Sequence, residues 1–202
     1  MGRPAQLSVR RGRPQMSAIV KAPVTGRVPV AGVNVAGDDQ ADRRVHGGPD
    51  KAVYAYAAED IAWWASELGR ALGPGVFGEN LTTEGVDVSG ALVGERWSIG
   101  TVELEVCQPR LPCAKLGLRF GEPGMVKRFA TAGRPGAYLR IVRPGELGAG
   151  DAVVVGERPA HGVTMALVSR AILLDDDLLG RAAQAPALPS SLAAWMRERA
   201  VA

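Results

Sequence analysis

The chain has 202 residues and a formal net charge of +3, with 47% hydrophobic and 22% charged residues. This length suits one large domain, or one domain with a small appendage, and its core is large enough to be stable without disulfides. The 26 glycines and 14 prolines exceed the roughly 12% usual for the pair, which in so apolar a chain predicts a turn-rich β fold and argues against disorder.

Short strands are predicted in the first part of the chain. Brief runs of β-branched residues are separated by Pro23 and Gly26, which favour turns. After an N-terminal arm or first strand over residues 1–16, the expected strands cover residues 17–22, 27–30 and 52–57. A helix follows over residues 58–69, because apolar residues recur there at helical spacing and Gly69 can end it.

The clearest β signal lies between residues 91 and 108. Val102, Leu104 and Val106 alternate with more polar residues, as a half-buried strand requires, and Gly100 separates this run from residues 95–99. The pattern predicts a hairpin. A second strand pair is expected at residues 137–142 and 152–155, and two short helices are expected between the pairs, at residues 113–120 and 125–132.

The composition changes after about Pro159, where the chain becomes rich in alanine and leucine. Helices are expected at residues 165–174, 175–183 and 191–201, with Ser190 or Ser191 as the N-cap of the last. The predicted fold is therefore mainly β over residues 17–158, followed by a small helical subdomain over residues 159–202.

The chain holds two cysteines, Cys107 and Cys113. Its first 25 residues contain no apolar run of signal-peptide length, and no later stretch reaches the roughly 18 apolar residues of a membrane span. These features predict a cytoplasmic protein in which both thiols stay reduced.

Cys113 is the leading candidate for chemistry. It follows Pro109 and Pro112, which stiffen the backbone, and Arg110 and Lys115 flank it. Neighbouring cations and the start of the expected helix favour the thiolate, which is the form that attacks or binds metal. The alternative is an inert buried thiol, which is common for free cysteine. Cys107 alternates onto the polar face of its strand and has no such surroundings.

Two further segments could bind a ligand. His46 is followed by Gly47 and Gly48, whose backbone amides can approach an anion closely, although a lone histidine in a loop is more often structural. Residues 77–83 place Asn80 among other hydrogen-bonding groups, and the same pattern also fits a capped turn. His161 lies at the expected domain junction and is interpreted as structural.

Several classes of site are excluded or weakened. The cysteines and the two histidines lack the spacing of a tetrahedral zinc site, and there is no G-x-G-x-x-G, Walker A or G-x-S-x-G motif. Twenty of the 24 basic residues are arginine, which fits an anionic ligand but also a GC-rich genome. The arginines near the N-terminus lack interleaved aromatic residues, so no nucleic-acid polymer is expected as a partner.

Taken in order, these segments resemble the MOSC domain, named for the C-terminal domain of molybdenum cofactor sulfurase. The resemblance covers residues 17–157, and the helical tail resembles the small bacterial subgroup that confers resistance to hydroxylaminopurine. The segments that carry it are Lys21 and Gly26, Gly37-Asp38 and Asp42, His46-Gly47-Gly48 with Asp50-Lys51-Ala52-Val53, Phe77-Gly78-Glu79-Asn80-Leu81, Gly94-Glu95-Arg96 with Ile99-Gly100, and Gln108 to Leu116.

The resemblance implies a β-barrel that holds a molybdenum cofactor (molybdopterin), with Cys113 as the metal ligand and catalytic residue. A soft thiolate suits such a metal, and the cofactor's phosphate suits cations and loop amides. The residues it assigns to the cofactor pocket are Arg110, Lys115, His46, Asn80, Gly47 and Gly48.

The function that follows is reduction of a small N-hydroxylated base or a related N-oxygenated compound. No flavin or nicotinamide fingerprint occurs in the chain, so a separate flavin or iron-sulfur electron donor is implied. Two alternatives use the same pocket: a carrier of persulfide sulfur or of the cofactor, and a non-catalytic binding module. The resemblance leaves a homodimer open and implies no membrane partner.

Overall fold

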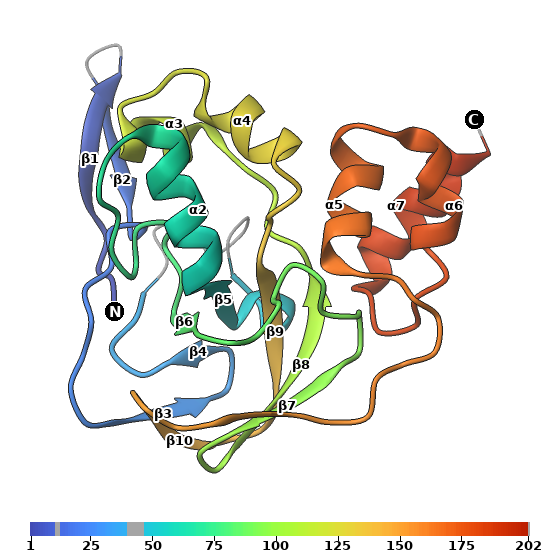
Figure 1. The fold of residues 1–202 in the computed structure, drawn as a ribbon, viewed down its shortest axis with the longest axis horizontal. Coiled ribbons are helices and arrows are strands. Elements are labelled where there is room, and N and C mark those ends of the chain that lie inside the picture. Colours follow the sequence, from blue (N-terminus) through green and yellow to red (C-terminus); the bar gives the residue numbers. More distant parts are fainter. Residues whose placement is uncertain (11–12, 40–46, 202) are drawn as a thin grey trace.

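Short strands with three α-helices between them occupy the chain up to β11, and helices alone follow in its C-terminal part (Figure 1). The computed structural model describes residues 1–10, 13–39 and 47–201, and gives only the backbone for residues 8–10 and 13–15. The strands are β1 (Ala5–Arg10), β2 (Arg13–Ser17), β3 (Arg27–Ala31), β4 (Asn34–Val35), β5 (Val53–Ala57), β6 (Leu81–Thr83), β7 (Arg96–Ile99), β8 (Val102–Gln108), β9 (Ala137–Arg143), β10 (Gly145–Gly148) and β11 (Val153–Val155). The helices are α2 (Ala58–Leu68), α3 (Ala114–Phe120), α4 (Met125–Thr131), α5 (Met165–Leu173), α6 (Leu179–Ala182) and α7 (Ser190–Ala200), with 3-10 turns η1 (Pro49–Lys51) and η2 (Asp176–Leu178).

The main sheet has the strand order β11-β7-β8-β9-β5-β6 and is antiparallel except for the β5–β6 pair. A three-stranded sheet with the order β10-β3-β4 lies beside it, and β1 and β2 form a separate hairpin. In Figure 1 the β3–β10 pair crosses the lower end of the long β7–β8 hairpin. Helix α2 lies above the β3–β10 pair in this view. The described residues therefore form the mainly β fold with helical additions that the sequence predicted.

The β7–β8 hairpin forms as predicted. Gly100 adopts a positive φ of 58° in the turn, and Ile99 pairs with Val102. The alternation ends at a register irregularity between Val106 and Gln108. This bulge turns Cys107 into the interior, where it is fully buried. The prediction that Cys107 lies on the polar face was wrong, because an extra residue in a strand reverses which side chains face inward.

Three further expectations about strands are corrected. The predicted strand over residues 17–22 ends at Ser17, and the segment that follows has no regular structure. Strands β9 and β11 do not pair with each other: β9 pairs with β8 and β5, whereas β11 pairs with β7. The short strands β6 and β10 lie in segments that were predicted to be turns, and no element had been predicted at β4.

The C-terminal helices form close to where the sequence predicted them, but the cap of the last helix differs. Pro189 occupies the N-cap of α7, and no serine side chain caps it. A side-chain cap does occur on α5, where the Thr164 hydroxyl accepts a hydrogen bond from the Leu167 amide at 3.1 Å.

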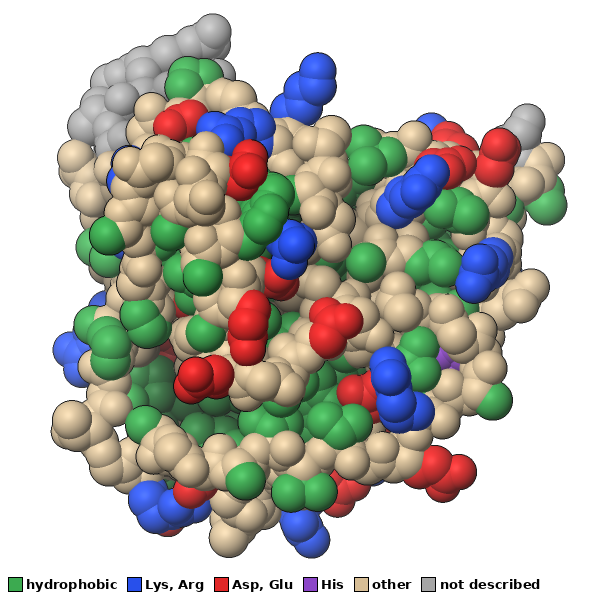
Figure 2. All heavy atoms as spheres, in the orientation of Figure 1, with side chains coloured by type: hydrophobic (Ala, Val, Ile, Leu, Met, Phe, Trp, Pro, Cys, Tyr) green, Lys and Arg blue, Asp and Glu red, His purple; other side chains and the backbone are tan. Residues whose placement is uncertain are grey.

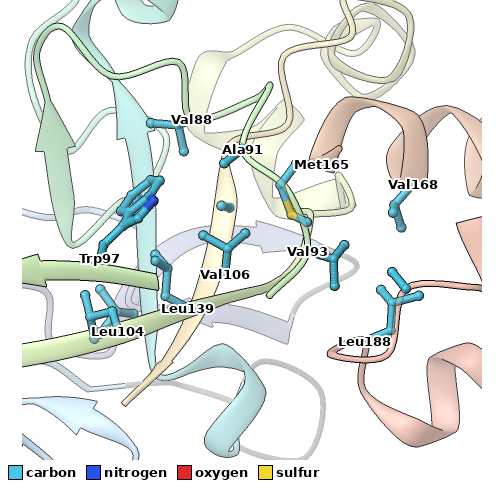
Figure 3. Close-up of a cluster of buried hydrophobic side chains, with 14 of the residues drawn as sticks. Val88, Ala91, Val93, Trp97, Leu104, Val106, Leu139, Met165, Val168 and Leu188 are labelled. Atoms are coloured by element: carbon cyan, nitrogen blue, oxygen red, sulfur yellow. The ribbon is translucent and has the colours of Figure 1, made fainter. Parts of the chain in front are cut away.

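The C-terminal helices share one hydrophobic cluster with the sheets. Figure 3 shows Trp97, Val106 and Leu139 from the strands in the same cluster as Met165 and Val168 of α5. A second, aromatic cluster lies between α2, α3, α4 and β5, and includes Tyr54, Tyr56, Trp64, Phe77 and Phe129.

The face drawn in Figure 2 is hollowed between α2 and the β3–β10 pair. Hydrophobic side chains line this hollow and acidic side chains stand near its edge, so its charge does not suit an anionic ligand. Within the described ranges, no helix is both long and apolar enough to cross a bilayer.

Candidate functional site

Cys113 lies in a pocket with a volume of about 100 Å³ that is built from segments far apart in the sequence. The segment after β2, the loop around Asp38, the end of η1, strand β5, the loop before β6 and the β8–α3 connection each supply part of the wall. The polar residues that line it include Lys21, Asp38, Asp39, Lys51, Asn80, Arg110, Cys113 and Lys115.

Cys113 is the N-cap residue of α3 and has an extended backbone, with φ −128° and ψ 168°. Its side chain makes no capping hydrogen bond and is partly exposed, so the sulfur is available to a ligand in the pocket. The helix begins where the sequence predicted it.

The other thiol has the opposite environment. The Cys107 sulfur lies 3.0 Å from the Asp50 carbonyl oxygen and 3.3 Å from the Tyr138 carbonyl oxygen. Burial raises the pKa of Cys107 to about 12. A protonated, enclosed thiol is inert, so Cys107 is a structural residue.

Arg110 forms the cationic floor of the pocket. It is 6% exposed, and its guanidinium donates to the Phe77 carbonyl oxygen and lies 5.2 Å from the Tyr54 ring centroid and 5.7 Å from that of Phe129. No carboxylate within the described ranges pairs with it. Burial alone would lower the pKa of Arg110, but its interactions with Tyr54, Tyr138 and Cys113 together have the larger effect, and the pKa is raised. The guanidinium is therefore a buried, permanent positive charge without a counter-ion.

Lys21, Asp38 and Asn80 form a buried polar cluster in the pocket wall. The Lys21 ammonium donates to Asp38 Oδ2, and the side chains are only 9% and 2% exposed. Asn80 Nδ2 also donates to Asp38 Oδ2, at 2.8 Å. Burial lowers the pKa of Lys21, whereas its charge interaction with Asp38 acts in the other direction.

Asn80 joins this cluster to the main sheet. Its side-chain Oδ1 accepts a hydrogen bond from the Tyr54 backbone amide at 3.0 Å, and its backbone amide donates to the Tyr54 carbonyl oxygen at 2.7 Å. Because both ends of the carboxamide are already used, Asn80 positions the wall of the pocket as well as lining it.

The Phe77 to Asn80 motif is organised by Glu79, which the sequence analysis did not single out. The Glu79 carboxylate is 3% exposed and accepts from the amides of Gly75 and Phe77 and from the Thr82 hydroxyl, at 2.5, 3.0 and 3.1 Å. At Gly78, with φ +79°, a Cβ atom would lie 2.8 Å from Ile19 Cγ1. The motif is therefore a tight loop that aims the Phe77 carbonyl at Arg110.

The structure brings four of the predicted site residues into one pocket: Cys113, Arg110, Lys115 and Asn80. Gly48 is the N-cap of η1, with φ 97°, so it shapes the turn that leads to Lys51. Neither Gly47 nor Gly48 is among the lining residues, and His46 lies outside the described residues. His161, as expected, is structural: its ring nitrogens lie 2.9 Å from the Val93 carbonyl and 3.0 Å from the Val163 amide.

Sequence reasoning missed the roles of Lys21, Asp38, Tyr54 and Tyr138 in this pocket. Lys21 and Asp38 do occur in the series of segments that carried the resemblance, and this was the signal that could have found them. The tyrosines lie on core strands, where an aromatic residue predicts packing and nothing more.

The arrangement suits an anion with a soft metal centre. Four cationic side chains and two carboxylates surround one accessible thiol. Over the described part of the chain, no group of three or more histidine, cysteine or acidic side chains could hold a metal by itself.

Comparison with known proteins gives the family. Residues 42–154 match the model of the MOSC domain. YiiM from Escherichia coli (strain K12) is 32% identical over 195 residues, which are 93% of this chain and 85% of YiiM. A protein named Reductase from Gibberella moniliformis (strain M3125 / FGSC 7600) is 33% identical over 177 residues, which are 86% of this chain and 31% of that protein.

The fold agrees with this result. The crystal structure of YiiM from Geobacillus stearothermophilus matches with a TM-score of 0.79 at 28% identity, over 98% of this chain and 95% of that chain. The expected MOSC-type fold, a curled sheet with short helices and a helical C-terminal part, is thereby confirmed. The chain belongs to the MOSC-domain family.

Proposed function

We propose that this pocket holds the molybdenum cofactor, with Cys113 Sγ as the metal ligand, and that the protein reduces N-hydroxylated bases or related N-oxygenated compounds. The observation that carries the proposal is that an accessible thiol lies in the same pocket as a buried guanidinium, which has no counter-ion among the described residues. These two groups, three residues apart in the chain, offer a soft ligand and an anion partner to one bound molecule.

The donor set fits the cofactor. A thiolate is a strong ligand for transition metals, and guanidinium and ammonium groups suit a phosphate. Arg110 and Lys115 flank Cys113 and both line the pocket, so they would hold the anionic end. Lys51 lines the same wall from the end of η1.

When bound, the cofactor would supply the two-electron chemistry that side chains lack. The chain's own residues fix its position and control protons. Arg110 keeps its charge at every accessible pH, and Cys113 presents its sulfur from the rigid start of α3. Reductive cleavage of an N–O bond takes up two electrons and two protons and releases water. Lys21 Nζ, held by Asp38, is a proton-bearing group in the pocket wall.

Electrons would come from a separate redox protein, because the sequence contains no flavin or nicotinamide fingerprint. The fungal relative named Reductase supports reductive chemistry in this family. This chain corresponds to less than a third of that protein, so the name belongs to a longer molecule.

The test is to purify the protein from a host that makes the cofactor and to measure molybdenum, pterin and reduction of an N-hydroxylated base with an added reductase partner. Cys113→Ser should lose molybdenum and activity together. Cys107→Ser is the matched control and should keep both, because that thiol is enclosed. Full activity of Cys113→Ser would contradict the proposal, and labile sulfur on Cys113 without molybdenum would indicate a carrier instead.

A further inference from the structure

A second cleft lies at the other end of α3 from Cys113. It has a volume of about 410 Å³, which is within the usual range for small-molecule sites. Arg70 and Arg119 line it together with an apolar wall that includes Leu72, Pro74, Val76 and Phe120. None of the described side chains that line it is acidic.

The positive charge of this cleft is not neutralised by its surroundings. The nearby carboxylates of Glu67 and Glu122 lie 4.0 and 3.6 Å from the guanidinium of Arg128, which they neutralise. Within the described ranges, neither Arg70 nor Arg119 forms an ion pair. Two guanidinium groups therefore share one concave surface without an acid.

The two arginines differ in how firmly they are held. Arg70 Nη2 donates to the Phe120 carbonyl at 2.9 Å, and its Cζ lies 5.5 Å from the Phe120 ring centroid. Arg119 Nε is covered and has no hydrogen-bond acceptor among the described residues. No carboxylate in the described ranges pairs with Arg119, so its terminal N–H groups could donate paired hydrogen bonds to an anion in the cleft.

We propose that this cleft binds a small organic anion, a phosphate monoester or carboxylate attached to an apolar group. Guanidinium groups bind such anions through paired hydrogen bonds, and the leucine, proline, valine and phenylalanine wall would cover the apolar part.

The cleft is separate from the cofactor pocket but shares two structural elements with it. Helix α3 begins after Cys113 and ends at Phe120, a length of about 10 Å at 1.5 Å per residue. Val76 lines the cleft, and the next residue, Phe77, lines the cofactor pocket. The proposal does not depend on what the cofactor pocket binds.

Titration calorimetry on the full-length, cofactor-free protein tests the proposal, with phenyl phosphate, inorganic phosphate and phenol as probes. Phenyl phosphate should bind at a site that depends on Arg119, inorganic phosphate should bind there more weakly, and phenol should not bind measurably. Arg119→Gln should weaken phenyl phosphate binding about tenfold or more, and Arg119→Lys, which keeps the charge, should restore part of it. Thermal unfolding confirms that each variant is folded.

Two controls locate the site. Lys115→Gln removes a cation from the cofactor pocket and should leave binding unchanged, as should Arg96→Gln, which removes a paired arginine on β7. Equal affinity in the wild type and Arg119→Gln would overturn the proposal, as would absence of binding at millimolar concentration. Loss of binding in Lys115→Gln would place the probe in the cofactor pocket, and equal affinity for the two phosphates would refute the apolar part of the ligand.

Discussion

Replacing Arg110 with methionine tests whether this residue serves the stability of the protein or the binding of the proposed anionic cofactor. In a protein whose buried charges are neutralised internally, removing one partner destabilises the fold by about 3–5 kcal/mol. Arg110 has no such partner among the described residues, and its contacts are one carbonyl oxygen and two aromatic rings. The loss of stability should therefore be smaller.

The magnitude follows from these contacts. Losing the hydrogen bond to Phe77 costs about 1.5–3 kcal/mol, and losing the ring contacts of a desolvated cation costs about 2 kcal/mol. Removing a buried charge returns a desolvation penalty of several kcal/mol. For the cofactor-free protein we expect Arg110→Met to lie within about 2 kcal/mol of the wild type. Cofactor affinity should fall by at least about thirtyfold, since truncating one side of a buried charge pair costs about 2–5 kcal/mol.

Two measurements check this: denaturant unfolding of the cofactor-free protein, and retention of pterin during dialysis of the loaded protein. Arg140→Met is the matched control, because that guanidinium does have carboxylate partners, Asp50 at 2.7 Å and Glu105 at 2.8 Å. Its side chain is 27% exposed and lies outside the pocket, so solvent limits its loss of stability and the variant should retain pterin. If Arg110→Met is the less stable variant and still retains pterin, Arg110 serves the fold and not an anion.

Three further outcomes are expected. Asp38→Asn leaves the buried Lys21 ammonium without its carboxylate and should lower the free energy of unfolding by about 3–5 kcal/mol. The double variant with Lys21→Met should recover part of this loss. If the effects of the two substitutions on the free energy of unfolding simply add, Lys21 and Asp38 do not stabilise each other. Burial raises the pKa of Cys107 from 9.0 to about 12, so the unfolded thiol ionises first and stability falls as pH rises above about 9. Cys107→Ala should make that alkaline loss shallower in thermal melts, and an identical slope would count against the enclosed thiol. Glu79→Gln places an amide where backbone amides need an acceptor and should cost about 1–3 kcal/mol, so an unchanged unfolding midpoint would show that the loop does not depend on the carboxylate.

The parts of the fold that the sequence predicted are those determined locally. Helix α2 and the β7–β8 hairpin each carry a periodic pattern with a glycine at a turn or helix end, and Gly69 and Gly100 do adopt positive φ. Strands β4, β6 and β10 are short and depend on partners elsewhere in the chain, such as β3 for β10 and β5 for β6. Nothing in their own residues separates them from loops, because their partners supply the hydrogen bonds that make them strands.

The candidate site divides in the same way. Arg110, Cys113 and Lys115 lie within six residues, so their proximity could be predicted from the sequence. Lys21 and Asp38 are 17 residues apart and meet only because the chain returns to the same wall. The bulge at the end of β8 could not be predicted either, and it is the reason why Cys107 faces the interior.

Three features of the pocket each lower the stability of the cofactor-free protein. Arg110 is a buried charge without a counter-ion among the described residues, and Lys21 is a buried ammonium whose desolvation its partner Asp38 only partly offsets. Cys113 occupies a helix N-cap without capping it, where serine or aspartate would contribute about 1 kcal/mol. Destabilising residues that are scattered over a protein need no common explanation, but these three residues line one small pocket. Such a concentration is expected where a ligand supplies the missing interactions and returns the stability when it binds.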